Sequence, residues 1–172
     1  MISKKLLSAV EMALDAHKGQ VRKFSGKPYI SHPFRVLNRI KRFGISDEDI
    51  LVAAVGHDTI EDTKITYAKL KEVFNKDVAD MVKWLSNPVG GDKAAHIKNI
   101  FAQAPEGVVI IKTFDRIDNL SDGGSKKFFD KYKETSDIVR DGLKKRGFTK
   151  LYNEYMKTYD RVYGDHVGPF TK

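Results

Sequence analysis

Apolar side chains recur at intervals of three and four residues along most of this chain, which is the spacing of an amphipathic α-helix. Glycine, proline and small polar residues interrupt the pattern where helices commonly begin or end. Pro33 and Pro105 each fit the first turn of a helix, where a missing backbone N–H costs no hydrogen bond. The pattern predicts helices over residues 2–18, 31–43, 46–55, 66–74, 76–85, 92–103, 105–119, 126–145 and 149–163.

One apolar run is open to two interpretations. Val108–Ile111 could form a buried strand, because a short apolar run does not reveal its own period. However, the run continues to Asp115 and Asn119 at helical spacing, so we interpret it as part of a helix. The expected fold class is therefore all-α, a compact bundle with short connections. We expect one domain over residues 1–165 and a C-terminal tail over residues 166–172.

Composition narrows the class of protein. The chain has 172 residues, of which 41% are hydrophobic and 31% charged, as expected for one globular domain with a sizeable core. It has no cysteine, which excludes disulfides and thiolate zinc sites and agrees with a reducing cytoplasm. Glu11 and Asp15 interrupt the apolar run near the N-terminus, and no transmembrane segment is found. We therefore expect a cytoplasmic protein with no membrane partner.

The formal net charge of +8 raises the question of nucleic-acid binding. The Lys and Arg residues are spread along the chain with acidic residues between them, and no basic tail or zinc-finger spacing accompanies them. A basic surface suits a small polyanion such as a nucleotide equally well. We therefore expect a small-molecule nucleotide partner rather than nucleic acid; the oligomeric state is unknown from the sequence.

Candidate chemistry concentrates in the segment His57–Asp62. His57 continues the apolar face of the preceding helix, and Glu61 lies one turn further along that face. Asp58 and Asp62 form a second pair four residues apart. Four such groups at an apolar helix end are costly to bury unless positive charge lies among them. A divalent metal ion is the simplest source of that charge.

Two residues elsewhere are directed at the same interior. His32 lies one turn before the apolar face of its helix, and Asp115 lies on the helical stripe noted above. With the His57–Asp58 doublet they supply two imidazoles and two carboxylates, which suit manganese, iron, cobalt or zinc and leave room for water and substrate oxygens. Each residue alone has a simpler explanation: His32 as a helix cap or core histidine, and Asp115 as an ion-pair partner of Lys112 or Arg116. The combination favours a metal site.

Three motifs, taken in order, resemble the HD-domain phosphohydrolases: Tyr29–Pro33 (YISHP), His57–Thr63 (HDTIEDT) and Asp115–Leu120 (DRIDNL). The similarity is closest to the hydrolase domain of RelA/SpoT-type proteins, particularly the small stand-alone hydrolases that lack a synthetase half. It covers roughly residues 3–155. The resemblance implies that the expected bundle is an HD-domain fold with a single hydrolase domain.

The resemblance also implies an activity and a set of site residues. The activity is a manganese-dependent removal of the 3′-pyrophosphate from guanosine tetra- or pentaphosphate (ppGpp or pppGpp) in the stringent response, with zinc, iron or cobalt as alternative metals. The implied residues form three groups: metal ligands His32, His57, Asp58 and Asp115; carboxylates Glu61 and Asp62, which position and deprotonate the attacking water; and substrate contacts Arg22, Lys23 and Asn119.

Two places depart from the family pattern. Ser121 and Asp122 stand where relatives usually carry a basic residue and then a hydroxyl, and Asp118 replaces a common His or Tyr. The first change would reshape the pocket wall near the substrate phosphates. Two alternatives therefore stay open: an HD phosphohydrolase that acts on another nucleotide, and a non-catalytic binder of nucleotides or nucleic acid.

Overall fold

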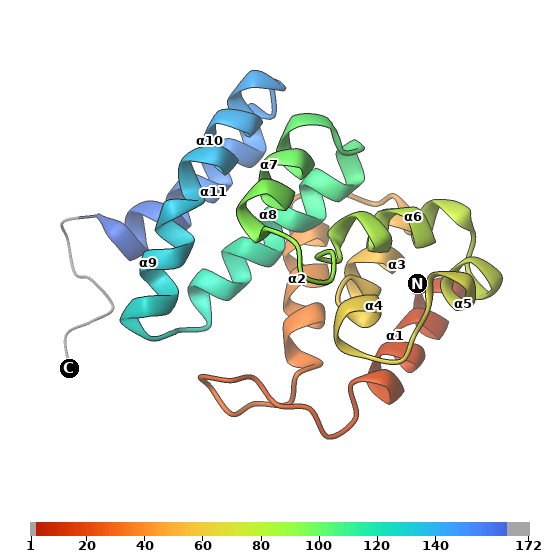
Figure 1. Ribbon diagram of the computed structural model, residues 1–172. Helices are drawn as coiled ribbons and strands as arrows, with labels where there is room; N and C mark the ends of the chain where they lie inside the picture. The colour runs from red at the N-terminus through yellow and green to blue at the C-terminus, as the bar shows by residue number, and fades with distance from the viewer. Residues whose placement is uncertain (1–2, 165–172) are drawn as a thin grey trace.

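The computed structural model describes residues 3–164, and this part of the chain folds as helices joined by short loops (Figure 1). The one β pairing among the described residues is an isolated antiparallel bridge between Val21 and Pro28. The all-α prediction is therefore confirmed. The elements are α1 (Lys4–Ala16), α2 (Ser31–Arg42), α3 (Glu48–Gly56), α4 (Thr59–Asp62), α5 (Tyr67–Val73), α6 (Lys76–Leu85), α7 (Lys93–Gln103), α8 (Glu106–Ser121), α9 (Lys126–Glu134), α10 (Ser136–Lys145) and α11 (Thr149–Tyr163).

Two helices, α3 and α8, form the centre of the core. Every residue of α3 from Leu51 to Gly56 is buried, and α8 is buried along most of its length from Gly107 to Leu120. Helix α2 packs against both of them, α1 and α6 cover α3, and α11 covers α8. Figure 1 shows α9, α10 and α11 on one side of α2 and α8, with α1, α3, α4, α5 and α6 on the other. The ambiguous run Val108–Ile111 lies inside α8, as predicted.

Local capping explains most helix starts. The side chains of Thr66, Asn75 and Asp92 each accept a hydrogen bond from a backbone N–H in the first turn of the helix that follows. Helix α3 was predicted to begin at residue 46 but begins two residues later, because Asp47 is the N-cap and accepts from the Ile50 N–H at 3.0 Å. The helix therefore begins at Glu48.

The single helix predicted over residues 126–145 is wrong, because the chain breaks at Thr135 into α9 and α10. The cause lies at the carbonyl oxygen of Tyr132, which accepts from Arg116 Nη2 at 3.0 Å and from the Ser136 hydroxyl at 2.8 Å. The Thr135 hydroxyl donates to the same oxygen at 3.2 Å. Side-chain donors thus replace the backbone N–H that would continue the helix. The last predicted helix, Thr149–Tyr163, is confirmed at both ends.

The loop over residues 20–30 leads from α1 to α2. It begins after Gly19, which has a positive φ of 80° that a residue with a Cβ would adopt only with strain. The Arg22 N–H donates to the Lys27 carbonyl oxygen at 2.8 Å and closes the loop. The loop lies beside the end of α8, where the Arg22 side chain contacts Asn119. Within residues 3–164 no helix combines the length and apolar character needed to cross a bilayer. The expected tail, residues 166–172, lies outside the described residues.

Candidate metal centre and active site

Three helices position the candidate metal ligands. His32 lies in the first turn of α2, and Asp115 lies in the middle of α8, which packs against α2. His57 and Asp58 form the junction where α3 ends and α4 begins. The Thr59 hydroxyl donates to the Gly56 carbonyl oxygen at 2.6 Å and holds this junction tightly turned.

The ligand atoms of these residues converge. The two imidazole Nε2 atoms lie 3.3 Å apart. Asp58 Oδ2 lies 3.1 Å from His57 Nε2 and 3.7 Å from His32 Nε2, while Asp115 Oδ1 lies 3.2 Å from His32 Nε2 and 3.8 Å from His57 Nε2. His32, His57 and Asp58 each offer an atom within 4.8 Å of the others. The four side chains singled out in the sequence therefore lie together, although up to 83 positions separate them (residues 32 and 115).

The hydrogen bonds of the two imidazoles fit a metal site. His57 Nδ1 lies 2.8 Å from the carbonyl oxygen of Ala54, and His32 Nδ1 lies 2.8 Å from a carboxylate oxygen of Asp118. Both partners are acceptors, so each Nδ1 carries a proton and each neutral ring presents a lone pair at Nε2. Two lone pairs that face each other at 3.3 Å, beside two carboxylate oxygens, repel unless a cation or extra protons lie among them. The donor set thus fits a divalent cation.

The acid–base properties of the site reflect the same demand for positive charge. Burial disfavours a charged His32, but hydrogen bonds to Asp115 and Asp118 outweigh it and raise the pKa of His32 to about 9. Burial likewise opposes ionisation of Asp115, yet Lys112 and the two imidazoles hold the pKa of this carboxyl well below its usual range. Without metal, protons on the imidazoles balance the carboxylates; a bound cation takes their place.

Asp118 is a site residue whose role sequence reasoning missed. Its side chain is fully buried, and its carboxylate accepts from His32 Nδ1 and from both Nε and Nη2 of Arg35 at 2.9 Å. Arg39 Nε adds a longer contact of 3.3 Å. Burial opposes ionisation, but the hydrogen bonds from His32 and Arg35 lower the pKa of Asp118 to about 2. The carboxylate is therefore charged and held from both sides.

Tyr29 links the ligand set to Asp62. Its hydroxyl donates to Asp58 Oδ2 at 2.7 Å and lies 3.0 Å from Asp62 Oδ2. The hydroxyl is thus a common neighbour of the two carboxylates. Burial and the charge of Asp58 raise the pKa of Asp62. The Tyr29 ring stacks on His17 with centroids 4.8 Å apart, so its position is fixed.

The structure places Glu61 differently from Asp62. The Glu61 carboxylate accepts from the backbone N–H of Asn87 at 3.0 Å and from its side-chain amide at 2.9 Å, and Lys93 Nζ lies 3.9 Å away. Glu61 is thus oriented by the linker between α6 and α7. Among the contacts of the described residues, those of Glu61 do not reach the four candidate ligands.

Arg22 and Asn119 connect the loop before α2 to the same centre. Arg22 Nη2 donates to Asn119 Oδ1 at 2.6 Å, and Asn119 Nδ2 donates to Asp115 Oδ1, also at 2.6 Å. Arg22 Nε donates to Asp122 Oδ2 at 2.9 Å. Lys23 is not tied to this network; its ammonium lies 5.8 Å from the centroid of the Phe24 ring.

Asp115 makes one of the ion pairs considered for it and also faces the candidate ligands. Its Oδ2 pairs with Lys112 Nζ at 2.9 Å, while its Oδ1 faces the imidazole nitrogens. Arg116, the other expected ion-pair partner, instead lies over the Tyr132 ring at 4.6 Å and donates to Thr135 Oγ1. The ion pair with Lys112 therefore does not remove Asp115 from the ligand set.

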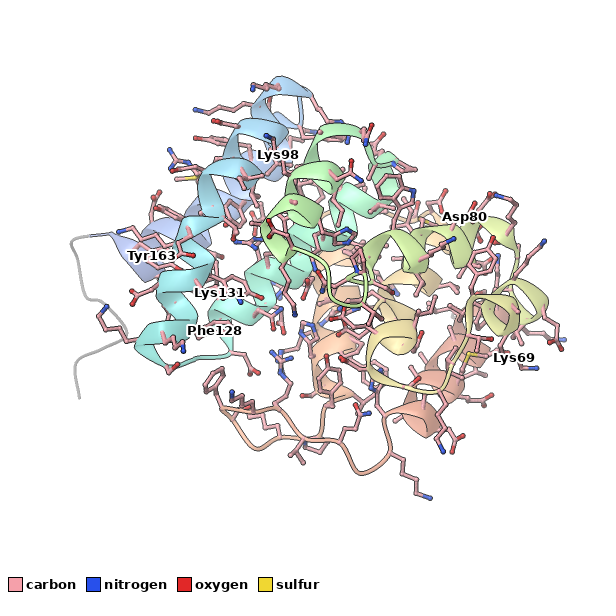
Figure 2. The ribbon with its side chains drawn as sticks, viewed as in Figure 1. Lys69, Asp80, Lys98, Phe128, Lys131 and Tyr163 are labelled. Atoms are coloured by element: carbon pink, nitrogen blue, oxygen red, sulfur yellow. The ribbon has the colours of Figure 1, made fainter. Side chains whose placement is uncertain are left out.

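Two pockets lie beside the cluster. The first, which we call the aromatic pocket, has a volume of about 440 Å³. Phe128 and Lys131 of α9 form one of its walls (Figure 2). The second, which we call the lysine pocket, has a volume of about 640 Å³. The aromatic pocket is lined chiefly by Arg22, Lys23, Phe24, Tyr29, Asn119, Asp122, Lys127, Phe128 and Lys131, and the lysine pocket chiefly by Asn87, Lys93, Lys112, Arg116, Lys131, Tyr132 and Thr135.

Each pocket is lined by residues that contact the candidate metal centre. Tyr29 and Asn119 of the aromatic pocket contact Asp58 and Asp115, respectively. Lys112 of the lysine pocket contacts the other oxygen of Asp115. A molecule with a flat ring at one end and phosphates at the other could therefore place the bond between them near the ligand cluster.

Comparison with known proteins identifies relatives of this chain. The sequence model of the family described as "HD domain" matches residues 9–104, more than half of the chain and the part that carries His32, His57 and Asp58. The bifunctional (p)ppGpp synthase/hydrolase SpoT of Escherichia coli K12 is 37% identical over 131 residues, which cover 71% of this chain and 18% of that protein. The chain thus spans less than a fifth of the length of this relative.

A shorter relative and a solved structure match more evenly. The guanosine-3′,5′-bis(diphosphate) 3′-pyrophosphohydrolase MESH1 of Danio rerio is 34% identical over 122 residues, which cover 68% of each chain. The structure described as a metazoan ortholog of SpoT that hydrolyses ppGpp superposes with a TM-score of 0.84 and 25% identity. That superposition covers 95% of this chain and 98% of the other. The similarity therefore extends over nearly the whole fold.

Proposed function

The chain belongs to the HD-domain family, and from that premise we propose that it is a metal-dependent hydrolase of ppGpp and pppGpp. Water would cleave the 3′-pyrophosphate from the nucleotide, which releases pyrophosphate and leaves GDP or GTP. The relatives named for this reaction support the proposal, in particular the stand-alone MESH1 of similar extent. We propose Mn²⁺ as the metal and the cytoplasm, where guanine nucleotides are held, as the location.

One observation carries the proposal: an aromatic pocket and a lysine pocket are each lined by side chains that contact the His/Asp cluster. The exposed Phe24 ring and the Phe128 ring, 5.3 Å apart between centroids, offer apolar surfaces for a base. Lys93, Lys112 and Lys131 offer charges for a pyrophosphate. A guanosine polyphosphate has both kinds of group, and its 3′ ester bond would lie between the pockets.

The four ligands and the two acidic residues divide the chemistry. His32, His57, Asp58 and Asp115 would hold the divalent cation, which polarises phosphoryl oxygens and lowers the pKa of water from about 15.7 towards 7. Asp62, whose pKa burial and Asp58 raise, is suited to accept the proton of the attacking water.

The remaining side chains would orient the reactants. Glu61, held by two donors of Asn87, would fix the line of approach of the water. Arg22 and Asn119 would bind the nucleoside side, where the guanidinium can pair with phosphate oxygens or stack on the base, and Lys23 would add a point charge at the rim. Lys112 and Lys131 would offset the charge on the departing pyrophosphate.

The direct test is to incubate the purified full chain with Mn²⁺ and ppGpp and to follow GDP and pyrophosphate by anion-exchange chromatography. We expect stoichiometric release of both, abolished by EDTA and by Asp58→Ala or Asp115→Ala. Asp77→Ala, an exposed acidic position on α6, is the matched control and should retain turnover. A folded, Mn²⁺-binding preparation that leaves ppGpp intact would refute the proposed substrate.

A second candidate, hydrolysis of a different nucleotide, is favoured by Asp122. This carboxylate pairs with both Arg22 and Arg35, so part of the positive charge available to phosphates is already neutralised. A panel of nucleoside triphosphates, 2′- and 3′-phosphorylated nucleotides and dinucleotides, assayed beside ppGpp, distinguishes the two. A non-catalytic binder is the outcome if none turns over and Asp58→Ala leaves nucleotide affinity unchanged.

A further inference from the structure

The neighbourhood of Asp118 leads beyond the ligand set. We propose that Asp118 is the positioning residue of the metal centre: its carboxylate fixes the orientation and tautomer of His32 and thereby sets the affinity for the cation. This inference rests on the proposed function only in requiring that His32 binds a metal.

The geometry of His32 gives the first support. Its ring lies between two carboxylates of α8, with Nδ1 2.8 Å from Asp118 Oδ2 and Nε2 3.2 Å from Asp115 Oδ1. The contact with Asp118 needs a proton on Nδ1, which leaves the Nε2 lone pair directed at His57 and Asp115. A carboxylate behind a ligating imidazole also makes it a stronger donor to the metal. His57 has only a neutral carbonyl in the equivalent place.

The environment of Asp118 gives the second support. The side chain is fully buried, so water cannot supply the hydrogen bond if the carboxylate is removed. Arg35 donates to both oxygens, from Nε to Oδ1 at 2.9 Å and from Nη2 to Oδ2 at 2.9 Å. Arg39 reaches Oδ1 at 3.3 Å. The carboxylate therefore cannot rotate away from His32 without breaking contacts to two arginines.

Asp122 provides a matched control on the same helix end. It also forms an ion pair with Arg35 Nη2, at 3.1 Å, and its side chain is 9% exposed, but its contacts are with Arg22, Ser25 and Arg35 and not with His32. Asp118→Asn and Asp122→Asn thus remove the same charge from the same arginine. Only the first removes the charged acceptor from the imidazole.

The experiment is a calorimetric titration of Mn²⁺ into the full metal-free chain, without nucleotide. We expect Asp118→Asn to weaken Mn²⁺ binding by about 10- to 100-fold, the range found when such supporting carboxylates are removed. Asp122→Asn should stay within about twofold of the wild-type protein, since it touches no ligand of the cation. Equal affinities of the two variants would overturn the inference while leaving the proposed metal site intact. A wild-type protein that binds no Mn²⁺ would overturn the metal site itself and the inference with it.

If the Asp118→Asn variant does not fold, a second measurement on the wild-type chain tests the inference. In the wild-type chain loaded with diamagnetic Zn²⁺, nitrogen-15 NMR should show His32 with a proton on Nδ1 that exchanges slowly, and with Nε2 bound to metal. Coordination through Nδ1, or a proton on Nε2, would overturn the inference. Thermal melts of both variants in EDTA report the purely structural cost of each substitution separately.

Discussion

Substituting Tyr29 by phenylalanine isolates one hydroxyl group at the centre of the site. That hydroxyl donates to Asp58 Oδ2 at 2.7 Å, the oxygen that also faces the two imidazoles, and lies 3.0 Å from Asp62 Oδ2. The ring itself stays in place, because it stacks on His17 and lies 5.5 Å from the Arg22 guanidinium carbon. Any effect of Tyr29→Phe can therefore be assigned to the lost hydrogen bonds.

The expected size follows from the charge of the acceptor. A hydrogen bond to a charged group is worth about 1.5–3 kcal/mol, roughly twice a neutral one. Since about 1.4 kcal/mol corresponds to a factor of ten, the substitution should weaken Mn²⁺ binding by about 10- to 100-fold. Turnover of ppGpp at saturating Mn²⁺ should also fall, because Asp62 loses the contact that positions it beside Asp58.

Calorimetry with Mn²⁺ and the steady-state rate with ppGpp measure the two effects. The matched control is Tyr67→Phe, which removes a phenol–carboxylate hydrogen bond of 2.8 Å to Asp80 on the surface between α5 and α6. Figure 2 shows Asp80 well away from Phe128, which lines the aromatic pocket. If Tyr29→Phe and Tyr67→Phe bind Mn²⁺ and turn over ppGpp equally well, the reasoning about Asp58 is refuted.

Two further predictions concern stability. Burial opposes ionisation of Asp49, but hydrogen bonds from Lys5 and Asn75 outweigh burial and lower the pKa of Asp49. Ionised Asp49 therefore stabilises the fold above the unfolded-state pKa of about 3.9, and this contribution is lost as pH falls through the folded-state pKa. Asp49→Asn should therefore lower the free energy of unfolding by up to about 1 kcal/mol in urea at pH 7. The difference from the wild-type protein should shrink as pH falls through the folded-state pKa of Asp49; a difference independent of pH would contradict the prediction. Gly142→Ala would place a Cβ 2.5 Å from Phe101 Cβ, and the overpacking cost of about 1–3 kcal/mol should exceed the gain of about 1 kcal/mol in helix propensity. Thermal melts should show a lower Tm for Gly142→Ala than for the wild-type protein. Gly56→Ala, whose added Cβ would have its nearest contact at 3.7 Å, should not lower the Tm. A Gly142→Ala variant more stable than the wild-type protein would refute the clash.

Much of the fold could be predicted because the helices obey local rules. Helix α11 begins at Thr149 and ends at Tyr163 as predicted, since its apolar spacing and the following Gly164 are both local signals. The break at Thr135 could not be predicted, because its cause includes the Arg116 guanidinium, which is 16 residues from Tyr132 in sequence and meets its carbonyl only after α8 and α9 have packed. Local sequence patterns carry no information about a donor from a distant helix.

The cluster of candidate metal ligands could be anticipated for a related reason. A polar or charged residue on an otherwise apolar helical face is costly to bury, so His57 at the end of α3 and Asp115 in α8 indicate a partner even before its identity is known. No such sequence signal identifies the contacts of the candidate substrate-binding residues. Arg22 and Lys23 are neighbours in one loop, yet Arg22 is joined to Asn119 and Asp122 while Lys23 lies over Phe24. Only the packed loop distinguishes them.

Asp118 shows which sequence signal could have been used and was not. Side chains three residues apart on a helix are neighbours, with Cβ atoms about 5–6 Å apart. Asp115 and Asp118 have that spacing, and the His32 ring of the crossing helix α2 lies between them with one nitrogen toward each carboxylate. When two buried carboxylates lie three residues apart opposite a histidine on a packed helix, each carboxylate can therefore contact a different ring nitrogen. One carboxylate can share the metal, while the other accepts the hydrogen bond from the protonated nitrogen. This division also explains why the residue at position 118 must be a hydrogen-bond acceptor and not merely a residue of the right size. An apolar side chain there would leave the buried Nδ1–H of His32 unpaired and two arginines without their shared anion.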